Sequence, residues 1–255
     1  MRSSVRLNVF LSICSFTLMS ESWASSGQVD MFEVKLGATR VIYDLSSNGG
    51  GLSVSNPQTY PMLVQSEVLD NMDIRSEQKT SSDFVVTPPL FRLDGGQQSK
   101  LRIVRTGGSF ATDRESLKLL CVKGIPPEKD DVWADKNRDK RATKSSMLVR
   151  AAVQQCIKLI VRPAGLRGMS DDAPRALEWT QEGRSLRVNN PTPFYVNIMS
   201  VIVDGLDIKM SYLSPFSTMK YDLPPKILAV HQVKWTAIND YGGETPAFEK
   251  LLNKK

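Results

Sequence analysis

The sequence predicts an all-β protein made of two β-sandwich domains. Short segments in which apolar and polar residues alternate recur along the chain, with turn-forming residues between them. No segment shows the periodicity of an amphipathic helix. A strand–turn–strand unit also occurs twice: a strand ends at Asn56-Pro57 and again at Asn190-Pro191, and an aromatic residue then precedes the next strand. We interpret this repetition as one such unit in each of two sandwich domains.

The longest predicted strand, residues 147–163, is the most informative segment. With a period of two, one face contains three cations, while the other face is nearly all apolar and consists of Met147, Val149, Ala151, Val153, Gln155, Ile157, Leu159 and Val161. A helix is the alternative, because Met, Leu, Arg, Ala and Gln favour helices. The β-branched residues at its end and the closing Arg162-Pro163 favour a strand.

A strand of this length would measure about 55 Å, which is more than one domain can cover. We therefore expect part of its apolar row to lie at a sheet edge, where another chain pairs with it. A bulge that breaks the strand is the alternative. Because proline interrupts strand pairing, Arg162-Pro163 is also the expected domain boundary.

The other expected strands are short and separated by turns or loops. The first covers Val29–Asp44, as one long strand or two joined ones. A short second strand ends at Asn56-Pro57, and the segment 84–93 is interrupted at Pro88-Pro89. The remaining expected strands are residues 62–69, 101–105, 116–122, 186–190 and 195–203. Residues 70–83 and 126–145 are charged and without periodicity, so we expect exposed loops.

The N-terminus predicts export. Arg2 and Arg6 precede an apolar run, Leu7–Met19, and the small-x-small sequence Ser22-Trp23-Ala24 follows. This order is typical of a secretory signal peptide, residues 1–24. The formal net charge of +6 includes no basic block interleaved with aromatic residues. Nucleic-acid binding is therefore disfavoured.

The cysteines agree with an oxidising compartment. Cys14 leaves with the signal peptide, so Cys121 and Cys156 remain and are expected to form a disulfide. Two free thiols are the alternative. A metal site is disfavoured, because His231 is the only histidine and no CxxC sequence occurs.

Candidate catalytic residues are nearly absent from the sequence. A single histidine leaves no basis for most Ser-His-Asp or Cys-His arrangements. The carboxylates of Asp130, Asp131, Asp135 and Asp139 lie among lysines and arginines, as expected for a solvated loop. We expect a protein that is not an enzyme and needs no cofactor.

Eight segments resemble the conserved blocks of periplasmic pilus chaperones, in order and over nearly the whole mature chain. They are Thr39–Tyr43, Thr87-Pro88-Pro89, Arg114–Leu117, Gly124–Pro127, Ile157–Leu159, Arg162-Pro163, Asn190–Tyr195 and Ile238–Gly243. The cysteine pair beside a long loop is similar to the subfamily with a long F–G loop. That subfamily assembles fibrillar adhesins and capsule-like antigens.

The resemblance implies two immunoglobulin-like domains in an L or boomerang arrangement, residues 25–162 and 163–255. It implies a periplasmic chaperone that lends a strand to fimbrial or fibrillar adhesin subunits and delivers them to an outer-membrane usher. The free form could self-associate through the exposed strand. The donor residues would be Met147, Val149, Ala151 and Val153.

The resemblance also implies roles for five charged residues. Arg40 and Lys158 would bind the C-terminal carboxylate of the subunit. Glu115, Arg162 and Asp240 would form a charge network in the cleft that sets the orientation of the two domains. An exported two-domain adhesin or binding module remains the alternative, and it predicts a charge or capping residue within residues 147–153 in place of the apolar row.

Overall fold

The computed structural model describes residues 28–70, 80–127, 131 and 148–252. The predicted signal peptide, Met147 and most of the two predicted loops lie outside these residues. The described chain contains many strands, no α-helix and one short 3-10 turn, η1 (Ser170–Asp172). Within it, no helix is long and apolar enough to cross a membrane.

The first half of the described chain forms two β-sheets around one core. One sheet has the strand order β2-β4-β8-β6; the other has the order β1-β10-β9-β5-β7, and β3 also pairs with β10. The strands are β1 (Gln28–Phe32), β2 (Lys35–Leu36), β3 (Arg40–Asp44), β4 (Gly50–Ser55), β5 (Met62–Leu69), β6 (Phe84–Thr87), β7 (Leu90–Leu93), β8 (Gln98–Arg105), β9 (Ser116–Ile125) and β10 (Leu148–Arg162). Buried side chains from both sheets, such as Leu52, Leu101 and Leu120, fill the space between them.

The second half has its own core between two further sheets. These have the orders β11-β12-β16 and β14-β13-β17-β18, with β15 paired to β13. The strands are β11 (Glu178–Glu182), β12 (Ser185–Asn190), β13 (Val196–Val203), β14 (Leu206–Asp207), β15 (Tyr212–Leu213), β16 (Ser217–Asp222), β17 (Gln232–Ile238) and β18 (Phe248–Leu251). Trp179 and Trp235 pack against each other in this core, with ring centroids 5.3 Å apart.

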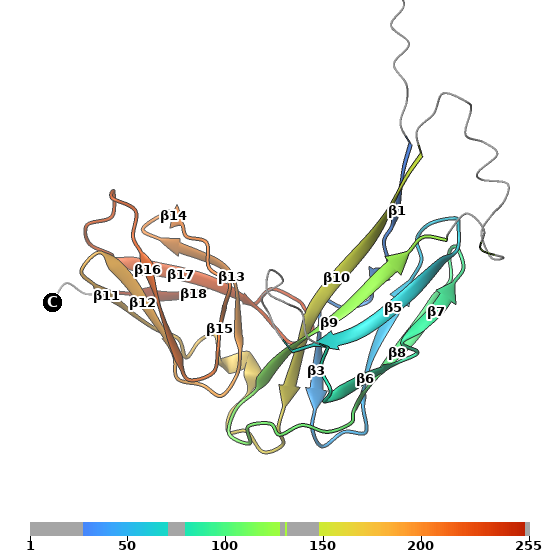
Figure 1. The fold of residues 1–255 in the computed structure, drawn as a ribbon. Coiled ribbons are helices and arrows are strands. Elements are labelled where there is room, and N and C mark those ends of the chain that lie inside the picture. The colour runs from blue at the N-terminus through green and yellow to red at the C-terminus, as the bar shows by residue number, and fades with distance from the viewer. Residues whose placement is uncertain (1–27, 71–79, 128–130, 132–147, 253–255) are drawn as a thin grey trace, which may run out of the picture.

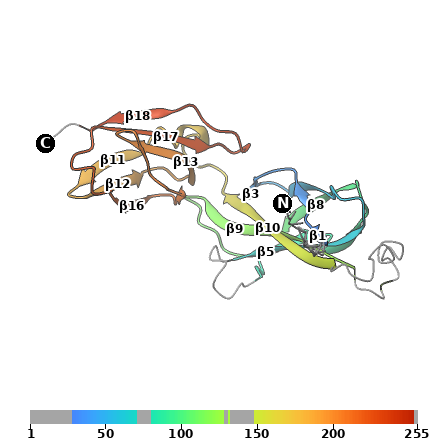
Figure 2. The same ribbon diagram turned by 90° about the horizontal axis from the view of Figure 1, so that it is seen from above.

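The two sandwiches meet at an angle, as the arms of an L (Figure 1). The C-terminal end of β10 lies at the junction, and the view from above shows the two arms diverging from it (Figure 2). The prediction of an all-β protein with two sandwich domains is confirmed.

The prediction for Val29–Asp44 is wrong in detail, because this segment forms three strands. β1 pairs with β10, β2 pairs with β4 in the opposite sheet, and β3 returns to β10. The chain therefore crosses between the sheets twice. In residues 84–93 the predicted interruption at Pro88-Pro89 is present, but the two parts are separate strands, because β6 and β7 lie in different sheets.

The strand prediction for the longest segment is confirmed. β10 pairs with β9 from Val153 to Val161 without a register shift, which excludes a bulge in this part of the strand. β10 is not a bare edge strand, however. β1 covers one side of residues 148–152, and β3 covers the same side of residues 158–162.

The two Asn-Pro turns have the same geometry in both halves. Asn56 donates to the carbonyl oxygens of Tyr60 and Leu93, and Asn190 donates to those of Phe194 and Ser214. In each case the asparagine side-chain oxygen accepts a hydrogen bond from the backbone N–H two residues later. Both amides are buried, so each is satisfied by the turn that it stabilises.

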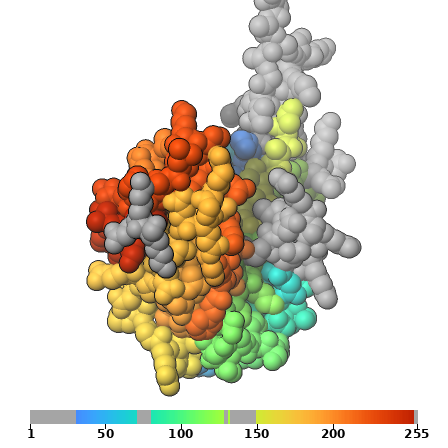
Figure 3. Space-filling view, turned by 90° about the vertical axis from the view of Figure 1, so that its left-hand side faces the viewer, coloured from blue at the N-terminus to red at the C-terminus, as the bar shows by residue number. Residues whose placement is uncertain are grey.

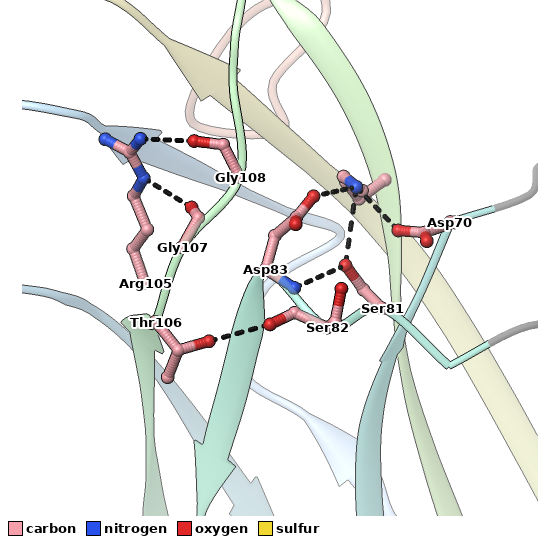
Figure 4. Close-up of polar contacts among 9 residues, drawn as sticks. Asp70, Ser81, Ser82, Asp83, Arg105, Thr106, Gly107 and Gly108 are labelled. Carbon is pink, nitrogen blue, oxygen red and sulfur yellow. Dashed lines mark hydrogen bonds and ion pairs between the residues drawn. The ribbon is translucent and has the colours of Figure 1, made fainter.

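The two ends of the predicted loop 70–83 are held by one lysine. Lys118 Nζ donates to Asp70 Oδ1 at 2.5 Å, to Asp83 Oδ2 at 2.7 Å and to Ser81 Oγ at 3.3 Å (Figure 4). Burial alone would lower the pKa of Lys118, but the two carboxylates raise it above its ordinary value. The ammonium therefore stays charged and keeps both ends of the loop against the sheet.

Candidate functional site

The apolar row of β10 changes its environment along the strand. At the C-terminal end, Leu159 and Val161 are fully buried in the core. Ala151 and Val153 are only half-buried, and Val149 is 38 % exposed. The fourth predicted donor residue, Met147, lies outside the described residues. The row is thus a core element at one end and a surface element at the other.

The exposed end of β10 extends beyond the strand that covers the rest of it. β9 ends at Ile125, and the pairing of β10 with β9 begins only at Val153. Residues 148–152 are paired only with β1 in the described structure, in a parallel ribbon that includes Met31, which is 50 % exposed. The ribbon projects from the sandwich in Figure 1, and Figure 3 shows the start of β10 in yellow-green at the surface beside blue β1.

A cavity of about 460 Å³ lies beside β10, between the places where β1 and β3 pair with it. On this side, residues 153–157 have no strand partner in the described part of the chain. The lining residues are Glu33, Lys35, Leu36, Ala38, Thr39, Pro57, Gln155 and Ile157. The strand pairing along this edge of β10 is therefore interrupted next to Lys158 and Arg40.

Arg40 and Lys158 are neighbours in register on β3 and β10. Arg40 is only 7 % exposed, and its Nη1 donates to the carbonyl oxygen of Ile238 at 3.3 Å. Its Nε is buried and has no hydrogen-bond partner. Unpaired buried donors are costly, and the described structure leaves this one unsatisfied.

Lys158 lies at the same junction, and its described contacts are with neutral groups. Its Nζ donates to Asn197 Oδ1 and lies 4.8 Å from the centre of the Tyr212 ring. Burial, and then the nearby charge of Arg40, lower the pKa of Lys158 to about 8. Burial lowers the pKa of Arg40, and the charge of Asp240 opposes this shift. Among the described residues neither Arg40 nor Lys158 has a carboxylate within ion-pair distance, so the charge of Lys158 has no described anionic partner.

Glu115, Arg162 and Asp240 form a connected network across the junction. Arg162 donates through Nε to Glu115 at 2.6 Å and through Nη1 to Asp240 at 2.8 Å. Glu115 also accepts a 2.7 Å hydrogen bond from the backbone N–H of Tyr195, and Ser170 donates to Asp240 at 2.8 Å. These contacts join the residue before β9 and the last residue of β10 to the second sandwich.

The pKa values of the two carboxylates in this network are shifted in opposite directions. Burial raises the pKa of Glu115 above its ordinary value, although Tyr195 and Arg162 oppose the shift. Burial would also raise the pKa of Asp240, but the hydrogen bonds from Arg162 and Ser170 lower it below its ordinary value. Arg162 is thus neutralised by two carboxylates, whereas Lys158 contacts only neutral groups among its described partners.

The predicted disulfide is present. Cys121 and Cys156 lie directly opposite each other on β9 and β10 and are bonded. The bond lies between the exposed and the buried parts of β10. Sequence reasoning missed Asn197 and Tyr212, because no local pattern marks residues whose partner lies on another domain.

Two family models match the chain. The model described as "Pili and flagellar-assembly chaperone, PapD N-terminal domain" matches residues 33–167, and "Pili assembly chaperone PapD, C-terminal domain" matches residues 172–249. Among curated relatives, chaperone protein AfaB of Escherichia coli is 49 % identical over 84 % of this chain and 83 % of its own length. Chaperone protein caf1M of Yersinia pestis is 40 % identical over 94 % of this chain and 95 % of its own length.

Solved structures agree with these matches. The E. coli chaperone DraB has a TM-score of 0.73 and 47 % identity, and the match covers 89 % of this chain and 100 % of DraB. A chain in the structure of the Salmonella enterica SafA pilin in complex with the SafB chaperone has a TM-score of 0.73 and 42 % identity, with 88 % and 98 % covered. The chain therefore belongs to the family of pilus-assembly chaperones, and it is a chaperone of fimbrial assembly.

Proposed function

We propose that this chaperone acts in the periplasm by lending the exposed part of β10 to a fimbrial or fibrillar adhesin subunit. The observation that carries the proposal is the gradient along β10, from fully buried Leu159 to exposed Val149 on the same face. An apolar row left at the surface on a projecting strand is costly for a protein that never covers it. A subunit that lacks a strand would cover the row and gain backbone hydrogen bonds from β10.

Val149, Ala151 and Val153 are the described residues of this donor segment, and Met147 would extend it. The charge or capping residue that a self-contained adhesin would need is absent from the described part of the row, which favours the chaperone reading. We assign residues 25–162 to a subunit-binding domain and residues 163–255 to a second domain that is held in place by Glu115, Arg162 and Asp240. The predicted signal peptide, residues 1–24, supports export, and an outer-membrane usher would receive the loaded subunit.

Arg40 and Lys158 would anchor the C-terminal carboxylate of the subunit. The guanidinium has an unused buried Nε, and the ammonium is held by neutral groups only. A carboxylate between them would gain charged hydrogen bonds in a partly desolvated site. The adjoining cavity and the unpaired edge at residues 153–157 leave room for the strand that ends in this carboxylate.

The test is co-expression with candidate subunits, isolation of the complex and amide hydrogen exchange of the free and bound chaperone. We expect a one-to-one complex in which amides of residues 148–153 become protected on binding. Amides of residues 159–161 should already be protected in the free protein, which makes them the internal control. A stable complex without added protection at residues 148–153 would contradict strand donation.

A further inference from the structure

The second domain presents a row of three residues to the two anchoring cations. Asn197 of β13 is in register with Tyr212 of β15 on one side and with Ile238 of β17 on the other. Arg40 and Lys158 form a matching row in the first domain, because β3 and β10 are also in register there. The two rows face each other across the domain junction.

The described contacts between these rows all use neutral groups of the second domain. Ile238 contributes a backbone carbonyl to Arg40, and Asn197 contributes a side-chain carbonyl to Lys158. Tyr212 contributes the face of its ring to the same ammonium. Asn197 is only 5 % exposed, so its side chain is fixed by its surroundings.

A comparison with Arg162 shows why neutral partners matter. Arg162 lies at the same junction but is bound by the carboxylates of Glu115 and Asp240, and its charge is compensated. Lys158 has a long flexible stem, and a carboxylate partner would fix it at the expense of its free charge. A neutral oxygen and an aromatic ring fix the ammonium and leave its charge, and its remaining N–H groups, available to an anion.

We propose that Asn197 and Tyr212 are positioning residues of the carboxylate site, which makes the second domain one wall of that site. This inference rests on the proposed function of Arg40 and Lys158 as the anchor. Asn197 sets where the ammonium of Lys158 lies, and Tyr212 supports it from the side. Capture of the subunit terminus then depends on correct docking of the second domain and not on the first domain alone.

The decisive variant is Asn197→Asp, which replaces the neutral acceptor by an internal carboxylate of nearly the same shape. The probes are two short synthetic peptides with the C-terminal sequence of a subunit that co-purifies with the chaperone, one with a free carboxylate and one amidated. We expect Asn197→Asp to lower affinity for the free-carboxylate peptide to that of the amidated peptide, while affinity for the amidated peptide is unchanged. A general structural defect would weaken the binding of both peptides equally.

Three further variants complete the experiment. Asn197→Ala should weaken binding of the free-carboxylate peptide about tenfold, because one charged hydrogen bond that orients Lys158 is lost. Tyr212→Leu should weaken binding of the same peptide by a smaller factor. Tyr212→Phe, which keeps the ring, should bind the peptide as the wild type does. If Asn197→Asp fails to fold, the difference between Tyr212→Leu and Tyr212→Phe decides the question.

Lys158→Ala separates this inference from the function on which it rests. If Lys158→Ala keeps the preference for the free carboxylate, the anchor itself is wrong. If Lys158→Ala loses the preference and the Asn197 and Tyr212 variants keep it, the anchor stands and the wall formed by the second domain is refuted.

Discussion

The two ends of β10 have the same alternating pattern and opposite environments. From Lys158 to Val161 the strand lies between β9 and β3, and its apolar row packs into the core. From Val149 to Val153 the row extends to the last residues of β9 and beyond them, and its side chains stay partly exposed. The pattern defines a strand and its apolar face, but the pairing decides which part of that face this chain can bury itself.

The largest effect is expected at the buried end. Leu159→Asp should unfold the first domain, because it places an unpaired charge in the core at a cost of several kcal/mol. Chemical denaturation followed by circular dichroism measures this effect. Ala152→Asp, on an exposed position of the same strand, is the matched control and should keep a near-normal midpoint.

Removal of the disulfide should have the next largest effect. Replacing Cys121 and Cys156 with alanine should lower the free energy of unfolding by about 3–4 kcal/mol, since the reduced chain gains loop entropy in the unfolded state. The measurement is urea unfolding of the double variant beside the wild type. An unchanged midpoint would show that strand pairing alone holds β9 and β10 together.

Loss of either proposed anchoring cation, Arg40 or Lys158, should affect capture far more than stability. Arg40→Ala and Lys158→Ala should abolish subunit capture, because an uncompensated terminal carboxylate loses its charged hydrogen bonds. Their unfolding free energies should stay within about 1 kcal/mol of the wild type. A large drop in melting temperature would instead assign these residues to the structure of the junction.

The pH dependence of capture and of stability should have opposite signs. The pKa of Lys158 is lowered to about 8, so between that value and the ordinary value of 10.5 the unfolded chain binds more protons than the folded one. The contribution of this group to stability therefore rises with pH across the window. Affinity for a carboxylate should fall about tenfold for each pH unit above the pKa, because only the charged form binds it.

A Lys158→Arg variant provides the control for this prediction. Its guanidinium stays charged throughout the window, so its carboxylate affinity should show no fall between pH values below and above about 8. An identical decline in both proteins would assign the pH dependence to another group.

Local sequence patterns predicted the parts of the fold that local physics decides. The strand that became β10, the disulfide and the two Asn-Pro turns depend on alternation, cysteine count and backbone restriction, all of which are visible in the residues themselves. The three strands within residues 29–44 were missed, because the crossing between sheets depends on which partner strand is nearby. The same limit hid the pairing of β1 with the exposed end of β10.

The candidate site was predictable to a similar degree. Arg40, Lys158, Glu115, Arg162 and Asp240 were named through resemblance, and the structure brings all five to one junction. Asn197 and Tyr212 were not named, because they reach Lys158 only after the second domain docks on the first. No spacing along the chain encodes that contact.

The most direct test of the account is Val149→Asp, measured by thermal unfolding of the free protein and by capture of a co-expressed subunit. Val149 is 38 % exposed, so we expect near-normal unfolding of the free variant and complete loss of capture, because the charge would have to enter the apolar groove of the subunit. Ala152→Asp adds the same charge to the opposite face and should retain both folding and capture. Failure of Val149→Asp to fold, or normal capture by it, would contradict the donation of β10.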